Sequence, residues 1–441
     1  MTTKEIDLHK IKNVHFVGIG GIGMSSLARH FLSEKKVVRG SDQELTDLTK
    51  TLTAEGIQVC CPQSVENIAP DTELVIYTEA VTQGSDGWAE LQEAKKKNIP
   101  TINYFEALGL AMNPYYLIAV AGTHGKTTTT AMLTDIFESA GKDPTAVIGS
   151  LRSSTQSNYR AGKSKYAIVE ACEYKRDFLH LRPEILVITN IELEHVDYYK
   201  SLEDVQDAFR TLVSQVSPDG CVVCDTRDPV VAAVVADSPA KVVDYTQFLD
   251  LQLALKQPGI HNKLNAAAAL TAALQEKIDR NDASQALTEF AGTWRRYQYK
   301  GELNGVPIYD DYAHHPTEIA VTIAATRELY PDKRIVVVFK PHTYTRAAAL
   351  FDAFAKSFRG ADRVCLLPIY GAREENVTGV SSREMAVKAL EYVANAQYFD
   401  SHHSLEENLR DTLTPDEVLI VMGAGDVTLV AESLTKKSSS V

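Results

Sequence analysis

Short apolar runs, each followed by glycine or polar residues and then by a helix-like segment, recur along most of the chain. Runs of this kind are typical of parallel strands that are buried on both faces of a sheet. The pattern predicts strands at Val14–Val17, Val37–Arg39, Gln58–Cys60, Leu74–Tyr77, Thr101–Asn103, Leu117–Gly122, Tyr166–Val169, Ile185–Ile188, Cys221–Cys224, Pro307–Tyr309, Arg334–Phe339, Arg363–Leu367 and Val418–Met422. Helices are expected at Met24–Leu32, Trp88–Lys97 and Ala266–Leu274. This alternation predicts an α/β fold built on parallel sheets.

The length and two breaks in the pattern predict three domains. A chain of 441 residues is too long for a single core, and the soft expectation is about three domains. Asn113-Pro114 is a linker signal, and Gly292–Tyr297 is a second boundary. We therefore expect a Rossmann-like domain at 1–112, a central mononucleotide-binding domain at 113–293 and a second Rossmann-like domain at 294–441.

The central candidate for chemistry is the glycine turn after Leu117–Gly122. The turn runs Gly122-Thr123-His124-Gly125-Lys126-Thr127 and leads into a helix-like segment. A strand, a glycine turn and a helix N-terminus gather backbone N–H groups around one point, where a phosphate fits. Lys126 can reach the outer phosphates of a nucleotide, and Thr127 or Thr128 can offer a hydroxyl to Mg²⁺. The turn is shorter than the strict phosphate-loop pattern, so an ordinary glycine turn with a solvated lysine is the alternative.

A second glycine turn lies near the N-terminus. Gly18-Ile19-Gly20-Gly21-Ile22-Gly23 follows a predicted strand and precedes a helix, which satisfies the dinucleotide-binding pattern in its required setting. Ser41 and Asp42 end the next strand, where an acid can bond a ribose hydroxyl. NAD is the default ligand for such a pattern. The downstream nucleotide turn argues against it, since a dehydrogenase does not need both.

Polar residues at other predicted strand ends supply further candidates. Glu170 and His195 each follow a strand of the domain that holds Lys126, and together they could ligate Mg²⁺ near the phosphates. Each could instead be a surface or hydrogen-bonded polar residue. Asn262 and Asn265 precede the alanine-rich helix, where they could cap it or read the edge of an adenine ring.

Composition narrows the partners and the compartment. The net charge of −13 argues against non-specific binding to nucleic acid or to an anionic membrane. No stretch approaches the roughly 18 apolar residues of a membrane span, and the first residues lack the apolar core of a signal peptide. Six cysteines in a chain of this length do not indicate a disulfide framework. We expect a cytoplasmic enzyme.

Taken together, these motifs resemble the Mur ligase family over nearly the whole chain. The strings that carry the resemblance are GIGGIGMSSLA, AGTHGKTTTT, GIHNKLNAAAA, WRRY, DDYAHHPTE and PHTYTR, with Glu170 and His195 at their strand ends. The resemblance implies ATP-dependent addition of L-alanine to the lactyl carboxylate of UDP-N-acetylmuramate, the first peptide-forming step of peptidoglycan precursor synthesis. It implies an acyl phosphate and then a tetrahedral intermediate.

The resemblance also implies roles for individual residues. The catalytic set is Lys126, Glu170, His195, Asp311 and His314. The ATP set is Gly122, Thr123, His124, Gly125, Lys126, Thr127, Thr128, Asn262, Asn265, Arg296 and Asp311. The UDP-sugar set is Gly18, Gly20, Gly21, Ile22, Gly23, Met24, Ser41 and Asp42. Alanine would be held by His314, His342 and Arg346, and Mg²⁺ (with Mn²⁺ as a substitute) by Thr127, Glu170 and His195. The expected assembly is a monomer or a homodimer.

The chain departs from the family pattern at several of these sites. Cys172, Tyr174 and Lys175 stand where further acidic or small residues are usual, Glu194 replaces an aspartate, and Thr343 stands where an arginine is frequent. The competing hypotheses are a sister ligase that adds a peptide to the same UDP-sugar, a polyglutamate-type ligase, a non-catalytic nucleotide-binding module and an NAD-dependent oxidoreductase.

Overall fold

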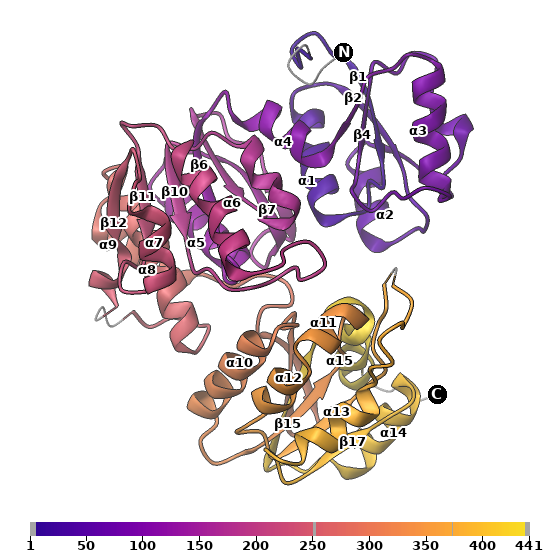
Figure 1. The fold of residues 1–441 in the computed structure, drawn as a ribbon, viewed down its shortest axis with the longest axis vertical. Helices are drawn as coiled ribbons and strands as arrows, with labels where there is room; N and C mark the ends of the chain where they lie inside the picture. Colours follow the sequence, from indigo (N-terminus) through magenta and orange to yellow (C-terminus); the bar gives the residue numbers. More distant parts are fainter. Residues whose placement is uncertain (1–5, 250–252, 373, 437–441) are drawn as a thin grey trace. The chain divides into compact units, whose positions relative to one another are not determined.

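The computed structural model describes residues 6–249, 253–372 and 374–436. Within these residues the strands form three sheets, and helices flank each sheet (Figure 1). The α/β class and the parallel sheets expected from the sequence are confirmed.

The first sheet has the strand order β3-β2-β1-β4-β5, and every pair in it is parallel. Its strands are β1 (Asn13–Val17), β2 (Val37–Ser41), β3 (Gln58–Cys60), β4 (Leu74–Tyr77) and β5 (Thr101–Asn103). The helices are α1 (Ile22–Ser33), α2 (Asp47–Ala54), α3 (Asp86–Lys96) and α4 (Tyr104–Met112), with a short 3₁₀ turn η2 (Val65–Asn67). The reversal of strand order at β1 puts the first glycine turn at the position where open parallel sheets bind ligands.

The second sheet has the order β12-β11-β10-β6-β9-β7-β8 and is parallel except for β8. Its strands are β6 (Tyr116–Ala121), β7 (Thr145–Arg152), β8 (Ser157–Arg160), β9 (Tyr166–Glu170), β10 (Ile185–Ile188), β11 (Cys221–Cys224) and β12 (Lys241–Asp244). The helices that accompany it in the chain are α5 (Lys126–Ser139), α6 (Leu202–Ser214), α7 (Pro229–Val235), α8 (Ile260–Gln275) and α9 (Arg280–Glu289), with 3₁₀ turns η3 (Tyr174–His180) and η4 (Tyr245–Phe248).

The third sheet has the order β13-β14-β18-β15-β16-β17, with β13 antiparallel at one edge. Its strands are β13 (Gln298–Leu303), β14 (Val306–Asp311), β15 (Arg334–Phe339), β16 (Arg363–Leu366), β17 (Ala396–Tyr398) and β18 (Glu417–Met422). Its helices are α10 (Pro316–Leu329), α11 (Tyr344–Ala349), α12 (Phe351–Ser357), α13 (Ser382–Ala389), α14 (His402–Thr412) and α15 (Thr428–Thr435), with the 3₁₀ turn η5 (Gly425–Val427).

The chain divides into two compact units. The first contains the first two sheets, and within it α1 packs against β7 and β8. The second contains the third sheet together with the segment Leu193–Asp204 and the stretch that ends at Asn265.

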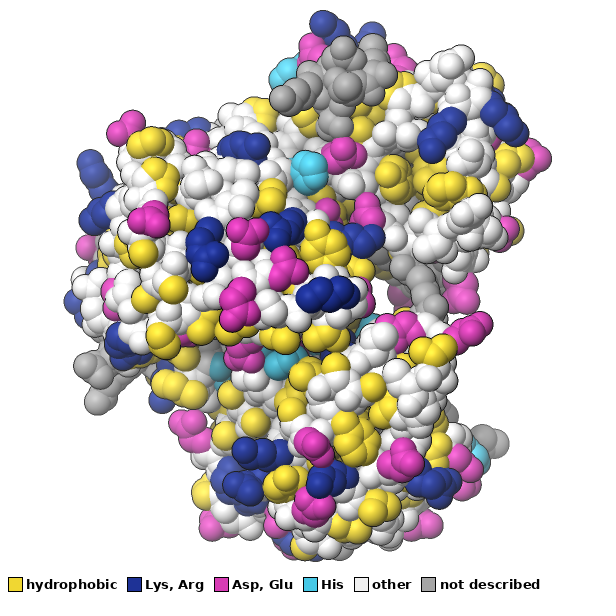
Figure 2. Space-filling model, viewed as in Figure 1, with side chains coloured by type: hydrophobic (Ala, Val, Ile, Leu, Met, Phe, Trp, Pro, Cys, Tyr) yellow, Lys and Arg dark blue, Asp and Glu magenta, His cyan; other side chains and the backbone are white. Residues whose placement is uncertain are grey.

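Burial explains why the strand predictions succeed. The residues of β6 from Leu117 to Ala121 and those of β15 from Ile335 to Phe339 are fully buried. Strands covered on both faces must be apolar along their whole length, so they stand out in the sequence. Among the described residues, no helix combines the length and the apolar character needed to cross a lipid bilayer. On the face shown in Figure 2, basic and acidic side chains are interspersed.

Candidate active site

The turn between β6 and α5 has the backbone shape that a phosphate site needs. Gly122 and Gly125 have φ angles of +134° and +82°, a region that L side chains rarely adopt. A Cβ at Gly122 would also collide with the Thr189 hydroxyl and the Asn190 backbone. Gly125 is the residue before α5, so the unpaired N–H groups of the first helical turn face the end of the strand.

The end of β10 fixes this turn in place. The Asn190 side chain accepts a hydrogen bond from the His124 N–H at 2.9 Å and donates one to the His124 carbonyl at 3.0 Å. Thr189 Oγ1 donates to the same carbonyl at 2.6 Å. The hydroxyl of Thr123 accepts from the Glu192 N–H at 2.8 Å. Sequence reasoning marked this strand end as polar but gave Thr189 and Asn190 no role.

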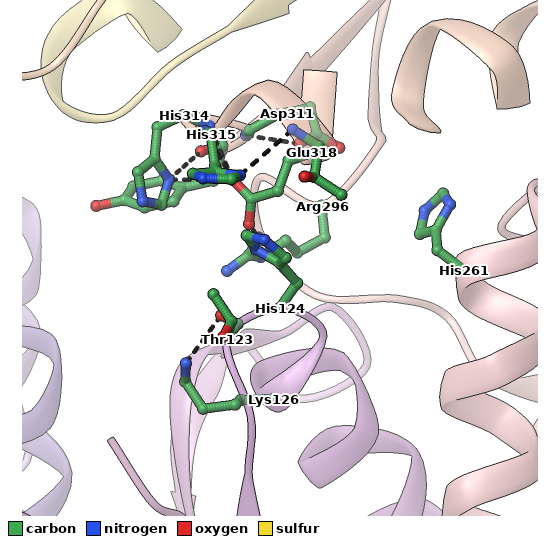
Figure 3. Close-up of polar contacts among 12 residues, drawn as sticks. Thr123, His124, Lys126, His261, Arg296, Asp311, His314, His315 and Glu318 are labelled. Carbon is green, nitrogen blue, oxygen red and sulfur yellow. Dashed lines mark hydrogen bonds and ion pairs between the residues drawn. The ribbon is translucent and has the colours of Figure 1, made fainter. Parts of the chain in front are cut away.

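Lys126 curls back over the turn, and Figure 3 shows its ammonium beside Thr123. Its Nζ donates to the carbonyls of Gly122 at 2.5 Å and Thr123 at 3.0 Å, and it pairs with Glu173 at 2.9 Å. Burial lowers the pKa of this lysine, but the Glu173 charge and other nearby acids outweigh burial and raise it above its usual value. The ammonium is therefore charged at neutral pH. Glu173, only 1% exposed, is a contact that the sequence prediction did not assign.

The predicted metal ligands fall in both units. Glu170 ends β9, and its Oε2 accepts a hydrogen bond from the Gly149 N–H at 2.9 Å. Thr127 and Thr128 are buried in the first turn of α5. His195 lies in the segment that belongs to the second unit and has a φ angle of +53°. A metal site shared by Glu170 and His195 therefore stays a prediction.

A cavity of about 310 Å³ in the first unit lies beside the first glycine turn and the end of β9. Its walls are Gly21, Ile22, Gly23, Met24, Thr78, Glu79, Tyr104, Phe105, Val147, Ile148, Gly149, Glu170 and Cys172. The first turn of α1 contains no acidic residue, so the positive end of its dipole faces the cavity without a resident counter-charge on that turn. The walls of this cavity thus include a helix N-terminus and the carboxylates of Glu79 and Glu170, and binding of the UDP-sugar there stays a prediction.

The first glycine turn uses part of its backbone to hold itself together. The N–H groups of Gly18 and Ile19 donate to the Ser41 carbonyl at 2.8 and 3.0 Å, and the Gly20 N–H donates to Asp42 Oδ2 at 2.7 Å. The N–H groups that remain for a ligand are those of the first turn of α1, which begins at Ile22. The N–H groups of Gly18 and Gly20 are thus engaged within the protein, and ligand contacts from the glycine turn and from the helix start stay a prediction.

Asp311 organises a turn at the start of the third sheet. It is 8% exposed, and its two carboxylate oxygens accept hydrogen bonds from the N–H groups of Ala313 at 2.7 Å and Tyr297 at 2.8 Å. Burial raises its pKa to about 6, although the Arg296 charge favours ionisation. Asp311 therefore joins the Trp294–Tyr297 connection to the end of β14 and holds Arg296 nearby.

His314 and Glu318 form the next part of this cluster (Figure 3). Glu318 Oε2 accepts from the N–H groups of His314 at 2.9 Å and His315 at 3.2 Å, so it caps α10. His314 Nδ1 lies 3.0 Å from the Tyr312 carbonyl. Burial lowers the pKa of His314 to about 4 against the opposing charge of Glu318, so its ring is neutral at pH 7. The Glu318 role was missed, although a glutamate three residues after His315 fits the capping-box spacing.

Two of the three predicted amino-acid ligands, His342 and Arg346, follow β15, whereas His314 follows β14. Arg346 pairs with Glu194 through Nη2 at 2.6 Å and Nε at 2.9 Å. Burial opposes ionisation of Glu194, but Arg346 and the neighbouring histidines hold its pKa at about 2. His342 precedes Thr343, which adopts a φ angle of +65° that is unusual for a β-branched residue. In the structure Arg346 therefore pairs with the carboxylate of Glu194, and the predicted ligand alanine also carries a carboxylate.

The two predicted adenine ligands lie inside a helix. The helix α8 begins at Ile260, ahead of the predicted start at Ala266, so Asn262 and Asn265 fall in its first two turns. Asn262 Nδ2 donates to the Pro258 carbonyl at 2.8 Å, and the two side chains lie 3.5 Å apart. Both side chains are buried, and recognition of an adenine edge by them stays a prediction.

Comparison with known proteins extends this picture. Residues 13–116 match the Mur ligase family catalytic domain, residues 120–248 the Mur ligase middle domain, and residues 295–425 the Mur ligase glutamate ligase domain. The UDP-N-acetylmuramate–L-alanine ligase of Agathobacter rectalis is 40% identical over 98% of this chain and 100% of its own length. The chain belongs to the Mur ligase family. The resemblance read from the sequence is confirmed.

Further relatives support the assignment to this family. The ligase of the same name from Caldanaerobacter subterraneus is 36% identical over 98% of this Mur ligase and 99% of its own chain. The crystal structure of UDP-N-acetylmuramate-alanine ligase from Thermotoga maritima superposes with a TM-score of 0.80 at 28% identity, covering 96% of this chain and 98% of that one. A murein peptide ligase from Psychrobacter arcticus, at 22% identity and a TM-score of 0.72, shares the fold.

Proposed function

We propose that this Mur ligase is a UDP-N-acetylmuramate–L-alanine ligase, which joins L-alanine to the lactyl carboxylate of the UDP-sugar at the expense of ATP. The observation that carries the proposal is the cavity in the first unit. Its lining includes a helix N-terminus without acidic residues and the carboxylate of Glu170, in the unit that also holds the Lys126 turn. This arrangement supports a long anionic substrate whose diphosphate and carboxylate lie at opposite ends.

The chemistry follows from the substrate's carboxylate, which is a poor acyl donor. One carboxylate oxygen attacks the γ-phosphorus of ATP, and ADP leaves, so an acyl phosphate forms. The neutral amine of alanine then attacks the acyl carbon, and the tetrahedral intermediate expels inorganic phosphate. Lys126 stabilises negative charge on the transferred phosphoryl group, because its buried ammonium stays charged at neutral pH.

Residues of the second unit would prepare the amine. The ammonium group of alanine must lose a proton before it attacks, and the unprotonated ring of His314 would accept a hydrogen bond from it and orient it. Arg346 would bind the alanine carboxylate, with His342 beside it. Arg296 and Asp311 would contact ATP, and Asn262 and Asn265 would recognise its adenine.

Mg²⁺ is the metal that the donor set suits. The Glu170 carboxylate and the hydroxyl of Thr127 are hard oxygen donors, and His195 would add an imidazole. The metal would supply positive charge to the phosphate oxygens, and Mn²⁺ has related preferences. Glu170 already faces the cavity, which supports its place in this set.

The remaining assignments complete the proposal. The UDP-sugar domain would span 1–112, with Gly18, Gly20, Gly21, Ile22, Gly23, Met24, Ser41 and Asp42 at its substrate end. The ATP domain would span 113–293, and the amino-acid domain 294–441. The partners are small molecules rather than nucleic acid or membrane, the assembly is a monomer or homodimer, and the reaction belongs to the cytoplasm, where ATP is available.

Phosphate release by the purified protein tests this function. The assay contains Mg-ATP and UDP-N-acetylmuramate, with single amino acids added in turn. We expect release that requires both the sugar and L-alanine, with a product heavier by one alanyl residue. Release only with a tripeptide would instead identify a peptide-adding ligase, and no release with any acceptor would refute the enzyme.

A further inference from the structure

Glu90 is a buried carboxylate in the first domain that none of the roles above uses. It lies on α3, is 0% exposed and accepts hydrogen bonds from four groups. The donors are Ser41 Oγ at 2.6 Å, the Ser64 N–H at 2.8 Å, Asn67 Nδ2 at 2.9 Å and His15 Nε2 at 3.1 Å. An ionised carboxylate has room for about four such bonds, so Glu90 is fully satisfied as an anion.

The charge state agrees with this geometry. Burial by itself raises the pKa of Glu90, but the bonds from His15 and Ser41 outweigh burial and lower it. Because an ionised carboxylate only accepts, His15 Nε2 carries its proton. Burying a charge is costly unless its hydrogen bonds are complete, so the cluster has one arrangement rather than several.

The four donors come from separate parts of the first sheet and its connections. His15 lies on β1, Ser41 ends β2, and Ser64 and Asn67 lie in the connection from β3 through η2. Glu90 thus ties together the middle of β1, the carboxyl end of β2 and the connection that follows β3. The carboxyl end of β2, where Ser41 lies, is on the edge where open parallel sheets bind ligands.

Ser41 connects this cluster to the glycine turn. Its side chain donates to Glu90, while its backbone carbonyl accepts the N–H groups of both Gly18 and Ile19. The turn leads directly into α1, whose first residues line the cavity. A shift of Ser41 would therefore tilt the N–H groups at the helix start away from a bound anion.

We propose that Glu90 is a positioning residue for the UDP-sugar, and that it acts through Ser41 to fix the glycine turn so that the first N–H groups of α1 face the diphosphate. This proposal rests on the proposed function, which assigns the cavity to the UDP-sugar. Glu90 does not touch the substrate, and its effect is on binding rather than on the chemical step.

Whether Glu90→Gln weakens or strengthens UDP binding distinguishes a positioning role from simple charge repulsion. Glu90 is negative, and so is the diphosphate. If only its charge mattered, Glu90→Gln would remove a repulsion and strengthen binding. If Glu90 positions the turn, the same change weakens binding, because a glutamine amide places a donor against one of the four donors.

Calorimetric titration of the full-length protein with UDP tests the proposal. We expect Glu90→Gln to raise the Kd for UDP about tenfold or more, and Ser41→Ala to raise it by a similar factor. The double variant should have a Kd for UDP no higher than that of the more affected single variant, because both changes break the same link from Glu90 through Ser41 to the glycine turn. Leu91→Ala, at a buried neighbour on α3, is the matched control and should lower the melting temperature with the Kd unchanged.

Unchanged or tighter UDP binding by a folded Glu90→Gln protein would overturn the proposal. If that variant does not fold, Asn67→Ala, which removes one of the four donors to Glu90 and is not in the predicted substrate set, decides by the same criterion. Kinetic assays add a second reading: the KM for UDP-N-acetylmuramate should rise while kcat and the KM for ATP stay constant. UDP binding needs no ligation, so a wild-type protein that binds UDP but does not use alanine would refute the proposed function and leave this inference standing.

Discussion

The two glycine turns of the first unit share a local design and differ in their charges. Each joins a buried parallel strand to a helix N-terminus, at β1–α1 and at β6–α5. In the first turn, the backbone is held by a neighbouring strand end through Ser41 and Asp42. In the second, it is held by Thr189 and Asn190, and Lys126 and Glu173 add a buried ion pair.

The difference in charge between the two turns fits the two tasks that we propose for them. A diphosphate that is bound but not transformed needs only oriented N–H groups, and stronger fixed charge would hold substrate and transition state alike. A phosphoryl group in transfer develops charge that a buried ammonium stabilises. The comparison suggests that similar backbone turns can serve binding or chemistry according to the side chains placed on them.

The largest effect that would test this division is expected at Lys126. Lys126→Ala should reduce kcat by about 1,000-fold or more, because it removes the buried positive charge at the second turn. The Kd for UDP should change by less than about twofold, because the first turn is independent. Steady-state phosphate release and calorimetry measure the two values.

Lys163→Ala provides the control, since it removes an exposed lysine of the same domain and should leave both values unchanged. Rapid turnover by the Lys126→Ala protein would show that the second turn is not the phosphoryl site.

Arg346 extends the comparison to the second unit. Arg346→Ala should raise the KM for L-alanine about 10- to 100-fold, because a charge-assisted pair with its carboxylate is lost. The KM for ATP should stay within about twofold. Initial rates over a range of each substrate give both values, and Arg359→Ala, at an exposed arginine of the same domain, is the control. An unaltered alanine KM would mean that the amino-acid pocket lies elsewhere.

Gly23 tests the first turn itself. A Cβ at this position would lie 2.8 Å from the Tyr104 ring, so Gly23→Ala must displace either the ring or the helix start. UDP binding should weaken about tenfold, with a smaller change in kcat at saturating substrates. Calorimetry and initial rates separate the two effects. Wild-type affinity for UDP would show that the first turn of α1 is not part of the binding site.

A smaller effect on stability is expected at Asp177, in the 3₁₀ turn that packs against α4 of the first domain. One oxygen, Oδ2, has no hydrogen-bond partner among the described residues, and burial, with Glu79 nearby, raises the pKa to about 7. The folded protein therefore holds this proton between pH 4 and 7 while the unfolded chain releases it, so stability falls as the pH rises through that window.

Asp177→Asn should remove the loss of stability that ionisation of Asp177 causes as the pH rises. The variant should melt a few degrees above the wild type at pH 8, with a much smaller difference at pH 4. Calorimetric melting across that range measures the difference. An equal shift at both pH values would show that ionisation of Asp177 is not the cause.

Much of the fold was readable because its strands are buried on both faces. Gln58–Cys60, Leu74–Tyr77, Ile185–Ile188 and Arg334–Phe339 were predicted with the bounds that the structure shows. The strands that were missed are β7 (Thr145–Arg152), β8 (Ser157–Arg160), β12 (Lys241–Asp244), β13 (Gln298–Leu303) and β17 (Ala396–Tyr398). All except β7 lie at sheet edges and are short or polar, so they lack the apolar signal of a covered strand. β7 is buried over most of its length, and its apolar run was overlooked.

Candidate site residues could be named from the sequence where the signal is local, and not where it depends on tertiary contact. The spacing of glycines and lysine in the sequence marks Lys126 and the two glycine turns as candidates. Glu173, Asn190 and Glu90 act on residues far away in the chain, and nothing local distinguishes them from other polar residues. Only the packing of sheets and helices shows which groups they hold.

Oxygen tracing tests most directly whether the two turns serve one reaction. UDP-N-acetylmuramate is labelled with ¹⁸O in its lactyl carboxylate and incubated with ATP, Mg²⁺, L-alanine and the enzyme. The account predicts one labelled oxygen in the released phosphate, because the carboxylate held in the first unit's cavity accepts the phosphoryl group bound at the Lys126 turn. Released phosphate without ¹⁸O, alongside normal product formation, would contradict it.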